Sequence, residues 1–164
     1  MICMILKSQP LVLRNLGMES GLSNLLVTDI EKDQKGFIWV ATEAGLNCFD
    51  GRRFRTFLKS NSNLSGNALN ALLFDKKENR LWVGSKTGLS IMDRTTMKFE
   101  RIPALDSLNI SNIVSLSYSA APDSNIWVAD HYYDIVLCHR QSGKVVTHLS
   151  AAKLKFPSSF RCVL

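Results

Sequence analysis

Three tryptophans occur in the same short apolar motif, and their even spacing constrains the fold more than any other feature of the chain. The motifs are Ile38-Trp39-Val40-Ala41, Leu81-Trp82-Val83-Gly84 and Ile126-Trp127-Val128-Ala129. The tryptophans are 43 residues (82 minus 39) and 45 residues (127 minus 82) apart. Internal repetition with a period of about 40 to 50 residues is typical of propeller blades. The sequence therefore predicts three copies of one structural unit.

The repetition extends to both sides of the tryptophans. An asparagine stands fifteen residues before each tryptophan, and apolar residues alternate with period two in the segment between them, which is typical of a strand. The first two copies also share a Gly-Leu pair and then an Asp after the tryptophan. The repeated positions are Trp39, Trp82, Trp127, Asn24, Asn67, Asn112, Gly45, Gly88, Asp50 and Asp93. We interpret these positions as scaffold, with the asparagines capping turns through their own side chains.

Each copy divides into four short strands. In the first copy they are expected at residues 25–32, 37–42, 46–49 and 54–58, with Gly or Asp in the connections. This spacing is typical of a four-stranded antiparallel meander. The second strand is apolar on both faces, so it must be covered on both sides, as happens when blades stack. We therefore predict an all-β fold, a partial β-propeller of three four-stranded antiparallel blades, with the tryptophans packed between blades.

The chain has 164 residues, of which 46% are apolar and 21% charged, as in a globular domain. Blades are expected at about residues 15–58, 59–102 and 103–149. Residues 1–14 are expected to form an N-terminal extension or an outer strand, and residues 150–164 the start of a truncated next blade or a tail. Three blades cannot close a ring, because propellers typically have about four to eight. The expected partners are therefore the remaining blades of a longer parent protein or a second copy of this chain.

Charge and cysteine usage exclude several classes of protein. The formal net charge is +6, but the basic residues are spread over several turns, so no nucleic-acid surface is expected. The four cysteines lie far apart without a C-x-x-C pair, which excludes a zinc ribbon or a thioredoxin motif. We expect no metal site and no cofactor. Lys7 and Pro10 interrupt the apolar N-terminus, which we therefore do not interpret as a signal peptide.

The repeat resembles the two-component regulator propeller repeat. The first copy carries Gly21-Leu22-Ser23-Asn24, Asp33, Gly36, the Trp39 motif followed by Thr42, Gly45-Leu46 and Phe49-Asp50. The third copy departs most, with residues 130–134 in place of a glycine-containing turn and His139 in place of the Asp. The resemblance covers about residues 15–149. It implies a periplasmic sensor region of a hybrid histidine kinase, and many such regions sense oligosaccharides. It also implies that the kinase and any contact with a membrane belong to a longer parent protein.

A propeller binds ligands mainly through the loops at one end of its channel, because rigid strands position loops that are free to vary. The turns between second and third strands are expected at that end, together with the connections into the first strands. We expect ligand contacts there from His131, Tyr132, Tyr133, Asp130, Glu43 and Lys86. Short polar groups beside two tyrosines suit a sugar, whose hydroxyls form hydrogen bonds and whose ring stacks on an aromatic face.

These observations predict a ligand-sensing propeller segment of a two-component sensor, for an oligosaccharide or another small molecule. Two alternatives stay open. One is a propeller scaffold for protein interaction. The other is a propeller lyase, because residues 126–130 resemble the streptogramin-inactivating lyases, in which histidines at the channel mouth act as acid and base. No catalytic residue is assigned and no enzyme is expected, since the three histidines lack metal-ligand spacing and no G-x-S-x-G, Walker or dinucleotide motif occurs.

Overall fold

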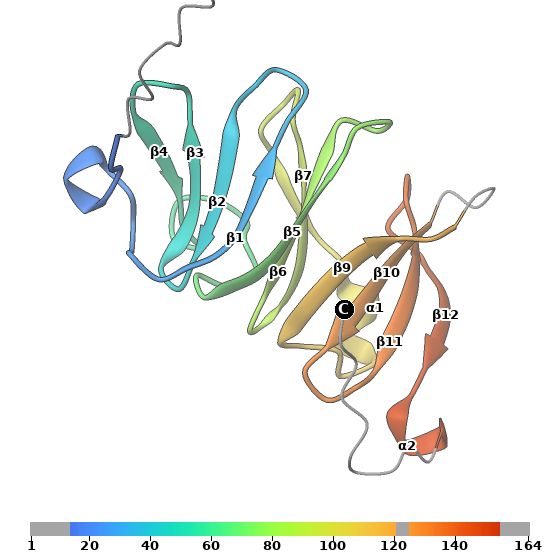
Figure 1. The fold of residues 1–164 in the computed structure, drawn as a ribbon. Helices are drawn as coiled ribbons and strands as arrows, with labels where there is room; N and C mark the ends of the chain where they lie inside the picture. The colour runs from blue at the N-terminus through green and yellow to red at the C-terminus, as the bar shows by residue number, and fades with distance from the viewer. Residues whose placement is uncertain (1–13, 121–124, 155–164) are drawn as a thin grey trace, which may run out of the picture.

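The chain forms three four-stranded antiparallel sheets in the computed structural model, which describes residues 14–120 and 125–154 (Figure 1). The first sheet contains β1 (Val27–Lys32), β2 (Ile38–Thr42), β3 (Gly45–Phe49) and β4 (Phe54–Phe57). The second contains β5 (Leu69–Asp75), β6 (Arg80–Ser85), β7 (Gly88–Asp93) and β8 (Phe99–Arg101). The third contains β9 (Ile113–Tyr118), β10 (Asn125–Asp130), β11 (Ile135–His139) and β12 (Val145–Leu149).

Helices are short and lie outside the sheets. They are the 3₁₀ helix η1 (Met18–Ser20) and the α-helices α1 (Pro103–Ser107) and α2 (Ala151–Leu154). The predicted all-β class with three four-stranded antiparallel units is confirmed. The N-terminal extension up to residue 13, the possible outer strand within it and the tail from residue 155 lie outside the described residues.

Each sheet is a meander in which every strand pairs with its neighbour in the sequence. In the first two blades the turn between second and third strands leads into Gly45 or Gly88, the first residue of β3 or β7. Their φ angles of 136° and 130° are ones that glycine adopts far more readily than other residues. The first strands β1, β5 and β9 contact one another in turn, and the sheets lie side by side in Figure 1. The three sheets are therefore arranged as successive blades, which we number one to three.

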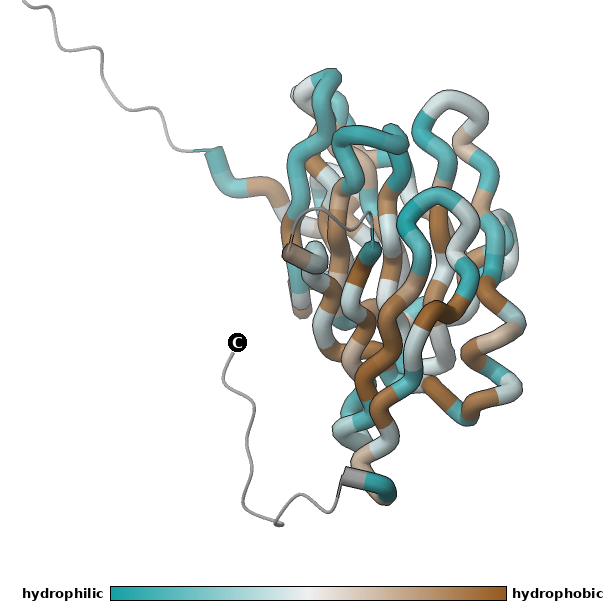
Figure 2. The backbone as a smooth tube through the Cα atoms, turned by 90° about the vertical axis from the view of Figure 1, so that its right-hand side faces the viewer, coloured by the Kyte–Doolittle hydropathy of each residue, from teal (hydrophilic) through white to brown (hydrophobic). Residues whose placement is uncertain are grey.

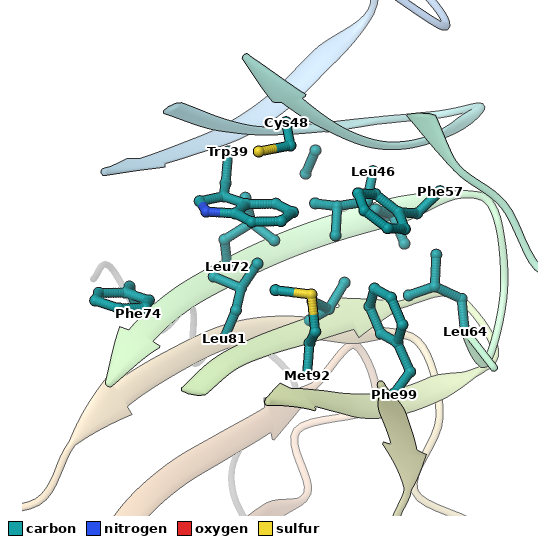
Figure 3. Close-up of a cluster of buried hydrophobic side chains, with 13 residues drawn as sticks. Trp39, Leu46, Cys48, Phe57, Leu64, Leu72, Phe74, Leu81, Met92 and Phe99 are labelled. Atoms are coloured by element: carbon teal, nitrogen blue, oxygen red, sulfur yellow. The ribbon is translucent and has the colours of Figure 1, made fainter. Parts of the chain in front are cut away.

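Apolar side chains fill the space between successive blades. Trp39 is fully buried between the first two blades, where it lies close to Phe57 and faces residues of β5 to β8 (Figure 3). Trp82 is fully buried in the corresponding cluster between the second and third blades. In Figure 2 the hydrophobic segments run along the strands, whereas hydrophilic residues gather in the turns at their ends. Each of these two indoles therefore stabilises a joint between blades.

Trp127 departs from this arrangement. It is only partly buried, because its face of the third blade points away from the second blade and no described blade follows. The opposite end of the stack shows the same effect: Ile30 is 59% exposed, whereas Leu72, in the same register of the second blade, is 4% exposed. The prediction that all three tryptophans pack between blades thus holds for two of them within the described residues.

The three asparagines before the tryptophans occupy different places in their blades. In each blade the turn between second and third strands donates an amide hydrogen to the residue that precedes the first strand. These bonds run from Glu43 N to Leu26 O, from Lys86 N to Ala68 O and from His131 N to Asn112 O. Hence Asn112 corresponds to Leu26 and Ala68, not to Asn24 and Asn67. The connection between first and second strands differs in length among the blades, which shifts the upstream residues relative to the tryptophan.

Their side chains also differ in what they bind. Asn24 Oδ1 accepts a hydrogen bond from Leu26 N within its own turn, as expected. Asn67 Oδ1 accepts from the more distant Lys59 N, and Asn112 Oδ1 accepts from Asn70 Nδ2. The common turn-capping role assigned to the asparagines therefore fits Asn24 alone.

Asp50 and Asp93 close the turns between third and fourth strands. Asp50 Oδ1 accepts the amide hydrogens of Arg52 and Arg53, and Asp93 Oδ1 accepts those of Thr95 and Thr96. These backbone hydrogen bonds hold the pKa of both carboxyls below the usual range. In the third blade His139 Nδ1 accepts from Ser142 N at 3.3 Å. The histidine that replaces the repeated Asp thus serves the same turn.

Candidate functional site

One end of the stack brings together the turns between second and third strands (residues 43–44, 86–87 and 131–134) and the residues before β5 and β9 (65–68 and 109–112). Thr87 Oγ1 donates to Ser65 O at 2.7 Å, and Asn112 N donates to Lys86 O at 2.9 Å. The second of these bonds crosses from one blade to the next. We call this surface the loop face. It contains five of the six residues expected to contact ligand, and the sixth, Asp130, ends β10 directly before it.

Glu43 and Lys86 form an ion pair across the first joint of the loop face. Lys86 Nζ lies 3.0 Å from Glu43 Oε1 and 2.9 Å from Oε2. The side chains are 30% and 51% exposed, so the pair contributes about 0–1 kcal/mol to stability. Because the pair is weak and accessible, a polar ligand group competes for either partner at low cost.

The third blade presents aromatic side chains on the same face. Tyr132 and Tyr133 are 64% and 58% exposed, and the rings of His131 and Tyr132 meet edge to face with centroids 5.7 Å apart. Tyr133 has a φ of 68°, in the left-handed region that residues other than glycine seldom adopt. The turn therefore holds aromatic surface in solvent at a conformational cost, which is a feature often found at binding sites.

The Asp130 carboxylate, in contrast, is occupied by hydrogen bonds from the backbone of this turn. It is buried, and its Oδ1 accepts hydrogen bonds from Tyr132 N at 2.8 Å and Asp134 N at 3.0 Å. Thr42 and Ser85 occupy the same register in the other blades, and their hydroxyls accept amide hydrogens in the same way. Burial raises the pKa of the Asp130 carboxyl, which the backbone hydrogen bonds only partly counteract. We therefore place Asp130 in the support of the loop face.

A line of contacts joins the three blades across the loop face. Glu43 binds the Lys86 side chain, the Lys86 carbonyl accepts from Asn112 N, and the Asn112 carbonyl accepts from His131 N. Asn70 Nδ2 fixes Asn112 by donating to its side chain and to Ile113 O. The predicted residues of the first two blades are thus in direct contact, and those of the third are linked to them through backbone hydrogen bonds.

Sequence reasoning missed two ion pairs at the opposite end of the blades. Arg94 of the second blade donates to Asp33 of the first at 2.8 Å, and Arg140 of the third binds Asp75 of the second. Each Asp lies at the end of a first strand, and each Arg directly follows the residue that closes the turn between third and fourth strands. The recurrence of an Asp and an Arg at these two positions is the sequence signal from which the ion pairs could have been predicted. The pairs fasten neighbouring blades and leave the loop face to other residues.

The described cysteines are core residues. Cys48 and Cys138 are free and buried, and burial raises the pKa of their thiols to about 11 and about 12 respectively. The thiolate forms are therefore suppressed near neutral pH. Within residues 14–120 and 125–154, no three His, Cys, Asp or Glu side chains gather in a way that suits a metal ion. In the same part of the chain, no helix has the length and apolar character to span a bilayer.

Three stacked four-stranded meanders with adjoining first strands define a segment of a β-propeller. Residues 21–44 match the family model described as "Two component regulator propeller". The predicted resemblance to this repeat is thereby confirmed, and the first blade carries it in the segment that holds Trp39.

Solved structures agree with this family. The chain superposes, with a TM-score of 0.78 and 32% identity over 88% of its length, on the extracellular domain described as that of a hybrid two-component system, BT3049, from B. thetaiotaomicron. It also matches the extracellular domain of the system BT4673 from B. thetaiotaomicron, with a TM-score of 0.64 and 20% identity over 85% of the chain, which shows the fold alone. The chain spans 21% and 18% of these two structures. No curated protein sequence matches the chain.

Proposed function

We propose that this chain is a ligand-sensing segment of an extracellular or periplasmic propeller that belongs to a two-component system. The observation that carries the proposal is the similarity, at 32% identity over 88% of the chain, to an extracellular domain described as part of a hybrid two-component system. In this proposal the remaining blades, the kinase and the contact with the membrane belong to a longer parent protein. The chain itself contributes binding and no catalysis.

The loop face is the proposed place of ligand contact. His131, Tyr132 and Tyr133 depart from the repeat and present accessible rings, while Glu43 and Lys86 supply a charged pair in partial contact with solvent. Aromatic faces beside polar groups suit an oligosaccharide or another small polar molecule. Ligand contacts on the second and third blades would be coupled through the hydrogen bonds that join Lys86, Asn112 and His131.

Thermal unfolding of the purified chain with a panel of oligosaccharides tests this proposal. A ligand that binds only the native state at about 100 times its Kd stabilises it by about 2.7 kcal/mol, which corresponds to a rise in Tm of roughly 5–10 °C for a domain of this size. We expect His131→Ala and Tyr132→Ala to abolish the rise. Lys35→Ala, an exposed substitution in the turn between β1 and β2 at the other end of the blade, should leave it unchanged.

Two results would count against the proposal. If no member of the panel raises Tm, an oligosaccharide is not the ligand. If the rise persists in His131→Ala and Tyr132→Ala, the ligand binds elsewhere than the loop face.

A further inference from the structure

A second site lies at the outer edge of the stack, between the first and second blades. A cavity of about 500 Å³ opens there between the outermost strands β4 and β8. Its lining includes Arg55, Phe57, Asn61, Met97, Lys98 and Phe99. None of the residues expected to contact ligand on the loop face lines it. Its volume is within the range of about 300–1,000 Å³ that small-molecule sites have.

One wall of the cavity is apolar. The rings of Phe57 and Phe99, one from each blade, lie with centroids 5.6 Å apart, and both side chains are otherwise buried. A ligand that rests on these rings contacts both blades. Because the two side chains are only 5% and 7% exposed, the wall offers a narrow apolar surface to one side of a small molecule.

Met97 completes this wall from a position where another blade has glycine. Met97 N donates to Asp93 O and has a φ of 58°, while Gly143 N donates to His139 O in the corresponding turn of the third blade, with a φ of 67°. A side chain in this left-handed conformation costs about 1 kcal/mol. The second blade thus carries a bulky side chain into the cavity at a position that favours glycine.

Positive charge at the cavity lacks a matching carboxylate. Arg55 and Lys98 are exposed and line it, whereas no Asp or Glu does. Among the residues that the structure describes, neither cation forms a salt bridge, and the Arg55 guanidinium instead lies 4.8 Å from the centroid of the Phe57 ring.

The cavity between the second and third blades provides the contrast. Its lining includes Glu100 together with Arg80 and Arg101. Arg101 pairs with Asp106 at 3.5 Å, and Arg80 donates to Gln141 O at 2.6 Å. Lys144 also lines this second cavity and forms no salt bridge among the described residues, so the first cavity differs only in that no carboxylate lines it.

We propose that the cavity between β4 and β8 binds a small organic anion. A carboxylate of the ligand lies between Arg55 and Lys98, where hydrogen bonds to charged donors are stronger than neutral ones. Its apolar face packs on Phe57, Phe99 and Met97. Asn61 Oδ1 accepts from Leu58 N and Asn61 Nδ2 donates to Thr56 O, which leaves the second hydrogen of Nδ2 for a ligand hydroxyl. The chemical class is a hydroxylated ring acid such as a uronate. This site is separate from the loop face and does not rest on the function proposed for it.

Calorimetric titration of the full chain with D-glucuronate tests the site. D-glucose is the matched neutral ligand, and acetate presents the carboxylate alone. We expect saturable binding of glucuronate that weakens as ionic strength rises, and affinities for glucose and acetate lower by about tenfold or more.

Variants separate the cavity from general charge attraction. Arg55→Ala with Lys98→Ala should lower the affinity for glucuronate by about tenfold or more. Arg52→Ala with Lys59→Ala removes the same charge from exposed positions outside the cavity and should change it little. Met97→Gly places glycine where the third blade has it, so the fold should persist while the affinity falls severalfold.

Three outcomes would overturn the proposal. They are equal affinity for glucose and glucuronate, equal losses in the two double variants, and absence of glucuronate binding by a chain whose near-ultraviolet circular dichroism shows packed aromatic residues. His131→Ala should leave glucuronate binding intact, so failure of this site and failure of the loop-face proposal are distinguishable.

Discussion

The two joints between blades are alike in their apolar packing and unlike in their polar contacts. Trp39 and Trp82 are both fully buried at the same place in the repeat. Trp39 Nε1 donates to Asp33 Oδ2 at 3.1 Å, whereas Trp82 Nε1 has no hydrogen-bond partner among the described residues. The repeat therefore fixes where an indole is buried without fixing whether its N–H group is paired.

The length of one turn accounts for the difference. Lys32 pairs with Ile38 in the first blade, and Phe74 pairs with Leu81 in the second, so the second turn has one more residue. Both carboxylates accept backbone amides of their own turns and bind an arginine of the next blade, but only Asp33 also accepts a hydrogen bond from the indole of its blade. A single insertion thus separates the buried carboxylate from the indole, while its bonds to the turn backbone and to the next blade persist.

The largest test of this comparison removes the indoles. Trp39→Ala and Trp82→Ala should each lower the free energy of unfolding by about 4 kcal/mol, because each leaves a large cavity in a packed joint. Trp127→Ala should cost about 1 kcal/mol, because its side chain is already partly exposed. Urea unfolding measures all three. An equal cost at Trp127 would mean that its face of the third blade is covered in solution.

The next effect concerns the ion pairs. Arg94→Met leaves Asp33 buried without its cation and should destabilise by about 3 kcal/mol, whereas Arg140→Met should cost about 2 kcal/mol. The difference arises because the Arg94 side chain is 7% exposed and that of Arg140 is 16% exposed. Replacing the Asp as well, with Asn, should recover part of each loss. If chemical denaturation shows a larger loss of unfolding free energy for Arg140→Met than for Arg94→Met, the predicted ranking of the two ion pairs is wrong.

Replacing each indole with a phenyl ring removes the N–H group together with part of the ring, so the difference between the two sites measures the smaller effect of the N–H group. Trp39→Phe deprives Asp33 of a hydrogen bond, whereas Trp82→Phe relieves an unpaired buried donor. We expect Trp39→Phe to be the more destabilising of the two by about 1 kcal/mol in the same assay. Equal costs would show that water or a rearranged turn satisfies Trp82 in solution.

Acid should produce the smallest difference between the joints. Burial acts to raise the pKa of Asp33, but hydrogen bonds from Trp39 and Arg94 outweigh it, so that its pKa lies below 3.8. A carboxyl with a lowered folded-state pKa stabilises above its unfolded-state pKa, and this contribution is lost as the pH falls through the folded-state value. As the pH falls below about 4, the unfolding free energy should therefore decrease more steeply in the wild type than in Arg94→Met. Parallel curves would contradict this role of Arg94.

The blades were predictable from sequence because their signals are local. Alternating apolar residues, glycine turns and the Trp39, Trp82 and Trp127 motifs each act within a few residues of the chain. The ion pairs were not predicted, because Asp33 and Arg94 are 61 residues apart and Asp75 and Arg140 are 65 apart. The common distance of fifteen residues to the tryptophan predicted that the three asparagines occupy equivalent positions. They do not, because the spacing alone does not reveal that the connection between first and second strands differs in length among the blades.

The loop face was predictable as a surface and less so in its members. The meander fixes which turns share an end, so Glu43, Lys86 and His131 were expected together on that surface. Asp130 was grouped with them because it adjoins His131, but its register places it with Thr42 and Ser85 as a turn-forming residue. The cavity at β4 and β8 was missed, since it depends on two outer strands that are brought together only by stacking.

The Asp–Arg pairs also give the stack a polarity. Both pairs join an acidic group at the end of one blade's first strand to a basic group in the blade that follows. A blade docked backwards or out of order would set like charges against each other or bury one alone, which costs about 3–5 kcal/mol. Correct neighbours are thus selected during assembly by charge as well as by shape.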